Sequence, residues 1–204
     1  MGFYSRLIFP RLCDWVMRDP KLTRLRKELV ADLKGEVLEI GFGTGLNLEH
    51  YPEQVVRIAA VDPGIGMGRF ARKRIEQSKI KVDQRMRTAE EIPFADQRFD
   101  YVVSTWTLCS IPDARRALAE VYRVLKPGGR FVFLEHGKSE DPSVHRWQRR
   151  LNWLQRRLAD GCRLDLDVKA LIAEQPFSVL ELDQFLLEQT PRTHGTMYRG
   201  MAVK

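Results

Sequence analysis

The chain has 204 residues, of which 44% are hydrophobic, and a formal net charge of +7. This length can bury a full core and predicts one domain with small extensions. No apolar run is long enough to span a bilayer, and the first residues lack the pattern of a secretory leader. Cys13, Cys109 and Cys162 show no Cys-x-x-Cys spacing, which argues against disulfides and a zinc site. We expect a soluble, cytoplasmic protein with reduced thiols and no bound metal.

The positive charge is concentrated in residues 69–74 and 146–157. An excess of Lys and Arg is typical of proteins that bind nucleic acid or anionic membranes. Helical spacing can instead spread these side chains over solvated faces, which is the commoner outcome. We therefore expect no nucleic-acid partner, whereas an anionic substrate or surface stays open.

Helical and strand patterns alternate from about residue 20, which predicts a largely parallel sheet with helices on both faces. Asp19 and Pro20 favour a helix start and Gly35 a stop, before a first strand at residues 36–40. The later helices are expected directly after the next glycines and at residues 65–77, 114–125 and 147–158. The later strands are expected at residues 55–62, 80–86, 99–105, 129–136, 177–187 and 195–203, the last two as an antiparallel edge pair.

The N-terminal segment is amphipathic, with apolar residues recurring from Phe3 to Val16, and Pro10 predicts that it forms two short helical pieces. Three interpretations stay open: a lid that brings Tyr4 to a substrate pocket, an amphipathic helix on a membrane surface, or a helix packed on the core. We divide the chain into a helical lid or cap at residues 1–34 and a main domain at residues 35–204.

The run VLEIGFGTG places Gly41, Gly43 and Gly45 directly after the first strand, and Asp62 ends the second strand. Glycine removes the Cβ atom that would keep a ligand away from the turn, and an acid at this position can accept hydrogen bonds from ribose hydroxyls. A tight turn that binds nothing is the alternative, and the acid in register makes it less favourable. The two strands with the glycine turn and Asp62 therefore predict an adenosine ligand.

Glu39 decides which adenosine ligand fits. The third glycine comes one residue earlier than in the dinucleotide pattern, and an acid beside the turn repels a pyrophosphate at close range. The same acid suits a ligand that carries an ammonium and a sulfonium group. These charges favour S-adenosylmethionine as the cofactor.

Four motifs, LEIGFGTG, VDPG, AEEIPFADQRFDYVVS and VLKPGGRFVFLEH, resemble those of the class I S-adenosylmethionine-dependent methyltransferases, in the group that includes the ubiquinone/menaquinone methyltransferases. The resemblance covers residues 36–136. It implies a Rossmann-like α/β fold with a seven-stranded, mostly parallel sheet whose last strand lies antiparallel beside the fifth. The cofactor contacts that it implies are Glu39, Gly41, Gly43, Gly45 and Asn47 near the methionine part, Asp62 and Pro63 near the ribose, Ala89 and Glu90 near the adenine, and Thr105 to Leu108 across the cofactor.

Shorter stretches, TLCSIPD, LEH, DGC and YRGMAVK, are similar to the methyltransferase-like alkyl thiol methyltransferases of animal membranes. The resemblance implies a thiol acceptor. The hydrophobic N-terminal anchor of that family has no counterpart in this sequence, so membrane contact is expected at most at the surface, through the N-terminal segment or the basic helix at residues 146–157.

Methyl transfer from a sulfonium depends mainly on aligning donor and acceptor, which can be worth about 7 to 11 kcal/mol. A thiol with a pKa of about 8.5 is partly ionised at neutral pH, whereas an amine with a pKa of about 10 must first lose a proton. The basic composition therefore favours a small lipophilic thiol. A phosphatidylethanolamine-like lipid, a quinone precursor and a non-catalytic nucleotide-binding protein are the alternatives; no oligomeric state is predicted.

His136 follows the fifth strand at the edge of the sheet where ligands bind, so it is the candidate general base. Its alternative is a histidine that bonds a loop. We also place Cys109 and Asp160 in the substrate pocket with Tyr4 and His136, against the alternatives of a packing thiol and a turn residue.

Overall fold

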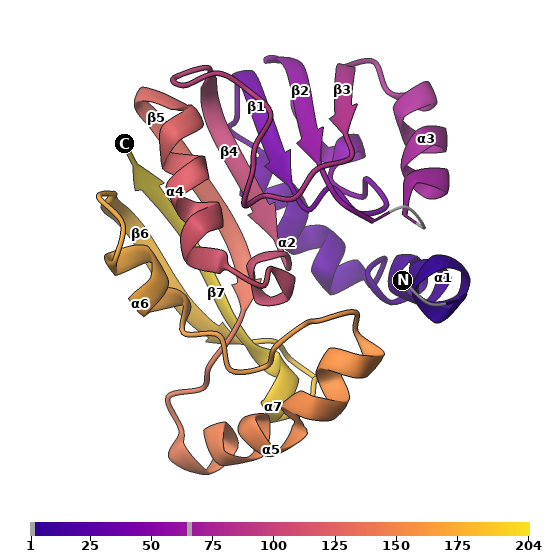
Figure 1. Ribbon diagram of the computed structural model, residues 1–204, viewed down its shortest axis with the longest axis vertical. Coiled ribbons are helices and arrows are strands. Elements are labelled where there is room, and N and C mark those ends of the chain that lie inside the picture. Colours follow the sequence, from indigo (N-terminus) through magenta and orange to yellow (C-terminus); the bar gives the residue numbers. More distant parts are fainter. Residues whose placement is uncertain (1–2, 65–66) are drawn as a thin grey trace.

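The computed structural model describes residues 3–64 and 67–204, which form one sheet with strand order β3-β2-β1-β4-β5-β7-β6 (Figure 1). Strand β7 is antiparallel to both of its neighbours, and the other neighbouring pairs are parallel. The described residues therefore confirm the predicted seven-stranded sheet with its antiparallel last strand. The strands are β1 (Gly35–Ile40), β2 (Val55–Val61), β3 (Lys81–Arg85), β4 (Phe99–Thr105), β5 (Leu125–His136), β6 (Ser178–Leu186) and β7 (Thr196–Val203).

Helices cover both faces of this sheet, and each face has its own hydrophobic core. On one face α4 and α6 pack against strand residues such as Phe131, and on the other α2 and α3 pack against residues such as Val132. This alternation along β5 is what a strand buried on both faces requires. The helices are α1 (Phe9–Val16), α2 (Pro20–Val30), α3 (Gly68–Gln77), α4 (Ala114–Val124), α5 (Pro142–Leu158), α6 (Val168–Ala173) and α7 (Arg192–Gly195), with short turns η1 (Tyr4–Ile8), η2 (Leu48–His50) and η3 (Leu108–Ser110).

The helix ends follow their sequence cues. Asp19 caps α2 by accepting a hydrogen bond from the Lys21 amide at 2.8 Å, and Pro20 occupies the first turn. Pro10 lies in the first turn of α1, where its missing N–H is tolerated, and the described residues 3–16 are helical without a gap. The predicted break at Pro10 is therefore corrected to a change from the π-helical turn η1 to α1. Within the described residues, none of the helices combines the length and the apolar character that crossing a membrane requires.

Two predicted helices differ from the structure. The segment after the glycines forms only the 3₁₀ turn η2, because the residue before Pro52 is forced into an extended conformation and Tyr51 has ψ 132°. The helix predicted at residues 65–77 begins at Gly68 among the described residues, and positions 65–66 lie outside them. The final pair, β6 and β7, is antiparallel and lies at the edge of the sheet as predicted, with β7 on the inner side beside β5.

Candidate active site

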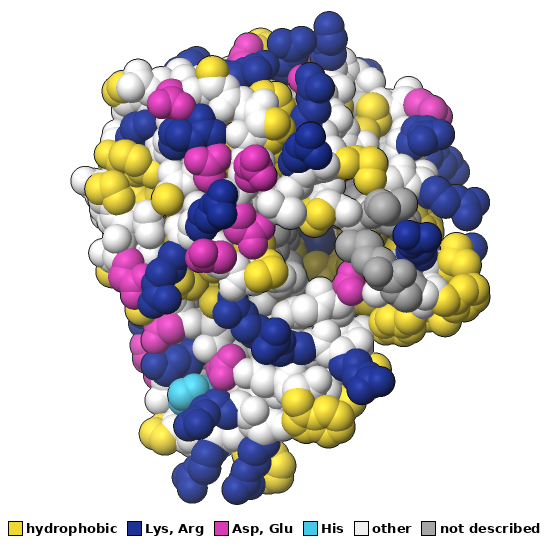
Figure 2. Space-filling view, viewed as in Figure 1, with side chains coloured by type: hydrophobic (Ala, Val, Ile, Leu, Met, Phe, Trp, Pro, Cys, Tyr) yellow, Lys and Arg dark blue, Asp and Glu magenta, His cyan; other side chains and the backbone are white. Residues whose placement is uncertain are grey.

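A cleft with a volume of about 500 Å³ lies at the carboxyl ends of β1, β2 and β4, where parallel sheets commonly bind ligands. Figure 2 shows a hollow on this face, between the part of the molecule that carries α3 and the part that carries α5. The cleft is lined by the glycine turn, the ends of β2 and β4, the segment at residues 88–90 and one face of the N-terminal helices. Its size is that of a small-molecule site.

The three glycines of the turn have different tasks. Gly41, Gly43 and Gly45 all have positive φ values, of 67°, 55° and 79°. A Cβ atom on Gly41 would overlap the side chain of Thr107, and one on Gly45 would lie 3.1 Å from Phe42. A Cβ atom on Gly43 would meet only a backbone oxygen at 3.8 Å, so this glycine leaves space for a ligand. Gly45 shapes the turn but does not line the cleft.

Glu39 is a buried carboxylate at the methionine end of the predicted site, with 1% of its surface exposed. Its oxygens accept hydrogen bonds from Asn47 Nδ2 at 2.9 Å and from the Tyr51 hydroxyl at 2.7 Å. Burial raises the pKa of Glu39 to about 7 in spite of these bonds. Among the described residues, Asn47 Oδ1 is buried without a hydrogen-bond partner. A buried acid beside an unused acceptor fits the ammonium group of an amino-acid ligand.

Asp62 is held rigidly at the end of β2. Its two carboxylate oxygens accept hydrogen bonds from the Gly43 amide at 2.7 Å and the Gly64 amide at 2.6 Å. Burial raises the pKa of Asp62, and these two amides act in the opposite direction. Each oxygen has a further lone pair, so Asp62 can accept hydrogen bonds from vicinal hydroxyl groups.

The other predicted cofactor residues fall into two groups. Pro63, Ala89, Glu90 and Thr105 line the cleft, as do Glu39, Gly41, Asn47 and Asp62. Leu108 does not line it, because its side chain is completely buried in the core beneath the face covered by α4. The prediction for Leu108 is therefore corrected to a core position.

The N-terminal segment lies over the cleft. Ser5, Phe9, Cys13 and Met17, spaced four residues apart, line the cleft with one helical face. The Ser5 hydroxyl donates to Asp160 Oδ1 at 3.0 Å, which fastens the segment across the opening. Of the three interpretations from the sequence, the lid is the one that this geometry favours.

Tyr4 was predicted to line the substrate pocket, but it does not line the cleft. Its hydroxyl instead donates a hydrogen bond to the carbonyl of Leu158, at the end of α5, at 2.6 Å. Asp160 does line the cleft, next to Ala159, and it also has a positive φ of 46° as a turn residue. Both of its interpretations from the sequence are therefore compatible with the structure.

Arg26 is a cleft residue that the sequence analysis missed. It is 4% exposed, and its Nη1 donates to the carbonyl of Met17 at 2.9 Å, while its Nε has no partner in the part of the chain that the structure describes. The guanidinium lies 4.6 Å from the centre of the Trp106 ring, and burial lowers the pKa of Arg26 to about 10. The available signal was a charged residue between Leu22 and Leu29 on the apolar face of α2. Its free donor fits a ligand carboxylate.

His136 and Cys109 are close together, but neither lines the cleft. Cys109 is 1% exposed and His136 6% exposed, and both contact Cys162 behind the cleft wall. Burial acts to lower the pKa of His136, but the hydrogen bond to Cys162 and the charge of that thiolate raise it. The pKa of Cys162 is lowered, chiefly by the hydrogen bond from the Cys109 thiol. The predictions of pocket-lining roles for His136 and Cys109 are thus corrected.

Residues 38–133 match a family described as a methyltransferase domain. The chain is 34% identical over 175 residues to "Thiol S-methyltransferase TMT1B" of Rattus norvegicus, covering 80% of this chain and 71% of that protein. It is 36% identical over 150 residues to "Demethylmenaquinone methyltransferase" of Symbiobacterium thermophilum, covering 66% of this chain and 60% of that protein.

The fold is shared with the N-methyltransferase NodS of Bradyrhizobium japonicum, which was crystallised with S-adenosyl-L-homocysteine. The TM-score is 0.69 at 19% sequence identity, with 93% of this chain and 91% of that chain covered. At this identity the likeness concerns the fold alone.

Proposed function

Because this chain belongs to the class I S-adenosylmethionine-dependent methyltransferases, we propose that it transfers the methyl group of this cofactor to the sulfur of a small lipophilic thiol. One observation carries the choice of acceptor. Among the described residues that line the cleft, none is a histidine, lysine or tyrosine. The acceptor must therefore reach its nucleophilic form without such a base, which a thiol does at neutral pH.

The cleft residues divide the cofactor between them. Glu39 and Asn47 would hold the ammonium group and Arg26 the carboxylate of the methionine part, while Asp62 would accept the ribose hydroxyls. When bound, the cofactor supplies an electrophilic methyl group on a positively charged sulfur. The protein contributes by fixing the position of that methyl group and by excluding water under the N-terminal lid, as catalysis by alignment requires.

The acceptor would occupy the apolar part of the cleft, formed by side chains of the lid and of the segment after β4. These side chains are Phe9, Met17, Trp106, Ile111 and Pro112. An amine acceptor is less favoured, because the carboxylates of Glu90 and Asp160 at this cleft would keep an ammonium group protonated. The same carboxylates disfavour a thiolate, but a thiol starts from a pKa of about 8.5, below that of an amine. The apolar lining also suits an alkyl chain.

Methyl transfer to three acceptors tests the proposal in parallel: a short-chain alkyl thiol, phosphatidylethanolamine vesicles and a demethylated quinol, each with product identified by mass. We expect the thioether as the main product. Methylated lipid or quinol with no thioether would overturn the thiol assignment and leave the methyltransferase assignment intact. Thermal stabilisation by the cofactor, measured separately, reports binding by mass action.

The outer face of the lid supports a second proposal, that the protein touches membrane surfaces peripherally. Phe3 and Trp15 are 72% and 75% exposed, and Trp153 of the adjacent α5 is 69% exposed. Figure 2 shows Lys and Arg side chains beside hydrophobic ones at the end of the molecule formed by α5. Apolar and basic groups together favour anionic bilayers. Co-sedimentation with anionic vesicles should fall in Trp15→Ser, and equal sedimentation of both proteins would contradict this role.

A further inference from the structure

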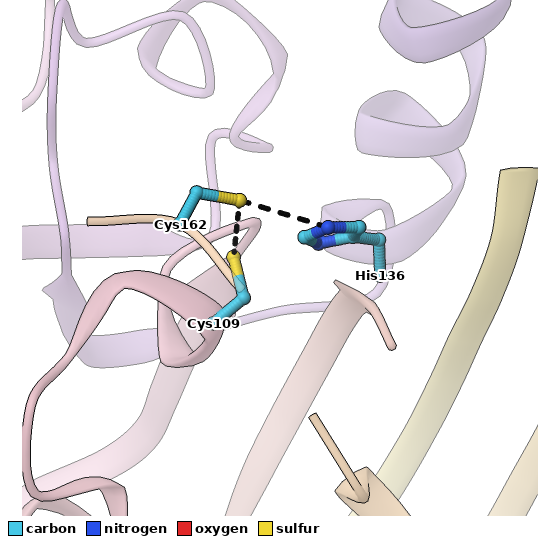
Figure 3. A group of neighbouring side chains, drawn as sticks. All are labelled: Cys109, His136 and Cys162. Atoms are coloured by element: carbon cyan, nitrogen blue, oxygen red, sulfur yellow. Dashed lines mark hydrogen bonds between the residues drawn. The ribbon is translucent and has the colours of Figure 1, made fainter. Parts of the chain in front are cut away.

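We propose that Cys109, His136 and Cys162 form a Zn²⁺ site behind the wall of the cleft. The three side chains come from η3, the end of β5 and the loop after α5, and Figure 3 shows that the two thiols point toward one another and the imidazole toward Cys162. Their ligand atoms all lie within 4.8 Å of one another. Two thiols and one imidazole are the donors that Zn²⁺ prefers over hard cations.

Two of the three ligand separations are close to those of a tetrahedral centre, and the third, between Cys109 and His136, is within 4.8 Å. Bond lengths of about 2.3 Å from zinc to sulfur and about 2.0 to 2.1 Å from zinc to nitrogen place tetrahedral ligand atoms roughly 3.5 to 3.8 Å apart. The two Sγ atoms are 3.4 Å apart, and Cys162 Sγ lies 3.6 Å from His136 Nε2. Shifts of a few tenths of an ångström would bring both pairs to the ideal separations. Three protein ligands leave a fourth position for water or a small thiolate.

The surroundings supply the outer contacts that zinc ligands usually have. Gln155 Nε2 lies 3.8 Å from Cys162 Sγ, and Ser110 Oγ lies 3.7 Å from Cys109 Sγ. Glu135, which precedes His136 in β5, is fully buried and accepts a hydrogen bond from Ser104 at 2.6 Å. A buried carboxylate near the three ligands favours a cation among them.

The site would fix the wall of the cleft. Ser110 follows one ligand and Asp160 precedes another by two residues, and both line the cleft. The loop after α5 is already joined to η3, since the Arg163 amide donates to the carbonyl of Cys109 at 3.0 Å. A zinc ion would add a bond from this loop to the end of β5. The ion would therefore hold the apolar part of the cleft in one shape, whatever acceptor occupies it.

Metal analysis tests the proposal without any activity measurement. The full-length protein, purified without a histidine tag and loaded with Zn²⁺, should retain about one ion per chain by mass spectrometry. Removing one ligand should weaken Zn²⁺ binding by at least about 100-fold, since loss of an outer-shell partner alone costs 10- to 100-fold. Cys109→Ser and Cys162→Ser serve as the ligand variants, with Cys13→Ser as the matched cysteine control that keeps the ion.

Thiol protection in the unaltered protein covers the case in which the variants do not fold. Zn²⁺ should slow alkylation of Cys109 and Cys162 but not of Cys13, as mapped by peptide mass. Co²⁺ should give the visible and sulfur-to-metal absorption bands of a tetrahedral thiolate site. Absence of protection, or equal zinc content in all the cysteine variants, would overturn the proposal.

Discussion

Replacing Glu39 by Gln should raise the free energy of unfolding of the ligand-free protein at alkaline pH and should weaken cofactor binding. Burial raises the pKa of Glu39 from 4.5 to about 7, a difference of 7 − 4.5 = 2.5 pKa units. At 1.36 kcal/mol per unit, the ionised side chain costs the folded protein about 3 kcal/mol. Glutamine keeps the shape and carries no charge.

The pH dependence of this cost has a definite sign. Because the folded pKa of Glu39 lies above its unfolded value, the native state holds the proton more tightly. The resulting stabilisation is fully present below the unfolded pKa and is lost as pH rises through about 7. The two proteins should therefore differ most in their free energy of unfolding at pH 8, with the variant more stable, and should converge near pH 4.5.

Binding should change in the opposite direction. The ligand's cationic group must offset the cost of about 3 kcal/mol, so losing the carboxylate should raise the Kd for S-adenosylmethionine roughly 100-fold at pH 8. Calorimetric titration and urea unfolding measure the two effects, with Glu36→Gln on the same strand as the control. Glu36 is half-buried, does not line the cleft and lies 3.7 Å from Arg98. A variant that binds the cofactor within a few-fold of the original protein, or that is less stable at pH 8, would refute this account of Glu39.

Three further substitutions, one of them with a matched control, test other contacts. Gly43→Ala and its control Gly128→Ala both place a side chain at positive φ, so each should lower the free energy of unfolding by about 1 to 2 kcal/mol. Only Gly43→Ala should weaken cofactor binding, and equal Kd values for the two variants would contradict the open space assigned to Gly43. Tyr51→Phe removes a hydrogen bond that lowers the pKa of the buried acid, so the pH midpoint for cofactor binding should move upward; an unchanged midpoint would argue against that bond. Phe9→Ala should raise the KM for alkyl thiols several-fold with little effect on the cofactor Kd, and a fall in cofactor affinity alone would place Phe9 elsewhere.

The sheet and the cofactor end of the cleft were predictable because their information is local. Gly41, Gly43 and Asp62 lie within one strand-turn-strand unit, and the chemistry of each residue is tied to its place in that unit. The last two strands were also visible as apolar runs. Their order was supplied by the family resemblance, since nothing local to β7 says that it inserts beside β5.

Contacts between distant segments were not predictable in the same way. Cys109 and Cys162 are 53 residues apart, and His136 and Cys162 are 26 apart, so no spacing rule joins them. The sheet brings the end of β5 beside η3, and the loop after α5 then closes on both. The same reasoning that argued against a zinc site from cysteine spacing therefore missed a cluster that only the tertiary fold assembles.

Arg26 shows a second limit. The leucine pattern of α2 located its buried face, but a charged residue on such a face has no partner that the sequence names. The partners are the carbonyl of Met17 and the ring of Trp106, which lies far along the chain. The Arg26 side chain thus became a site residue only once the cleft was seen.

A crystal structure with bound S-adenosylhomocysteine tests the central claim most directly. The account predicts the ligand's ammonium group within hydrogen-bonding distance of Glu39 or Asn47, its carboxylate near Arg26, and its ribose hydroxyls on Asp62. The sulfur should then face the apolar part of the cleft, beneath the lid. A nucleoside bound in the reverse direction, or in another part of the molecule, would contradict the account.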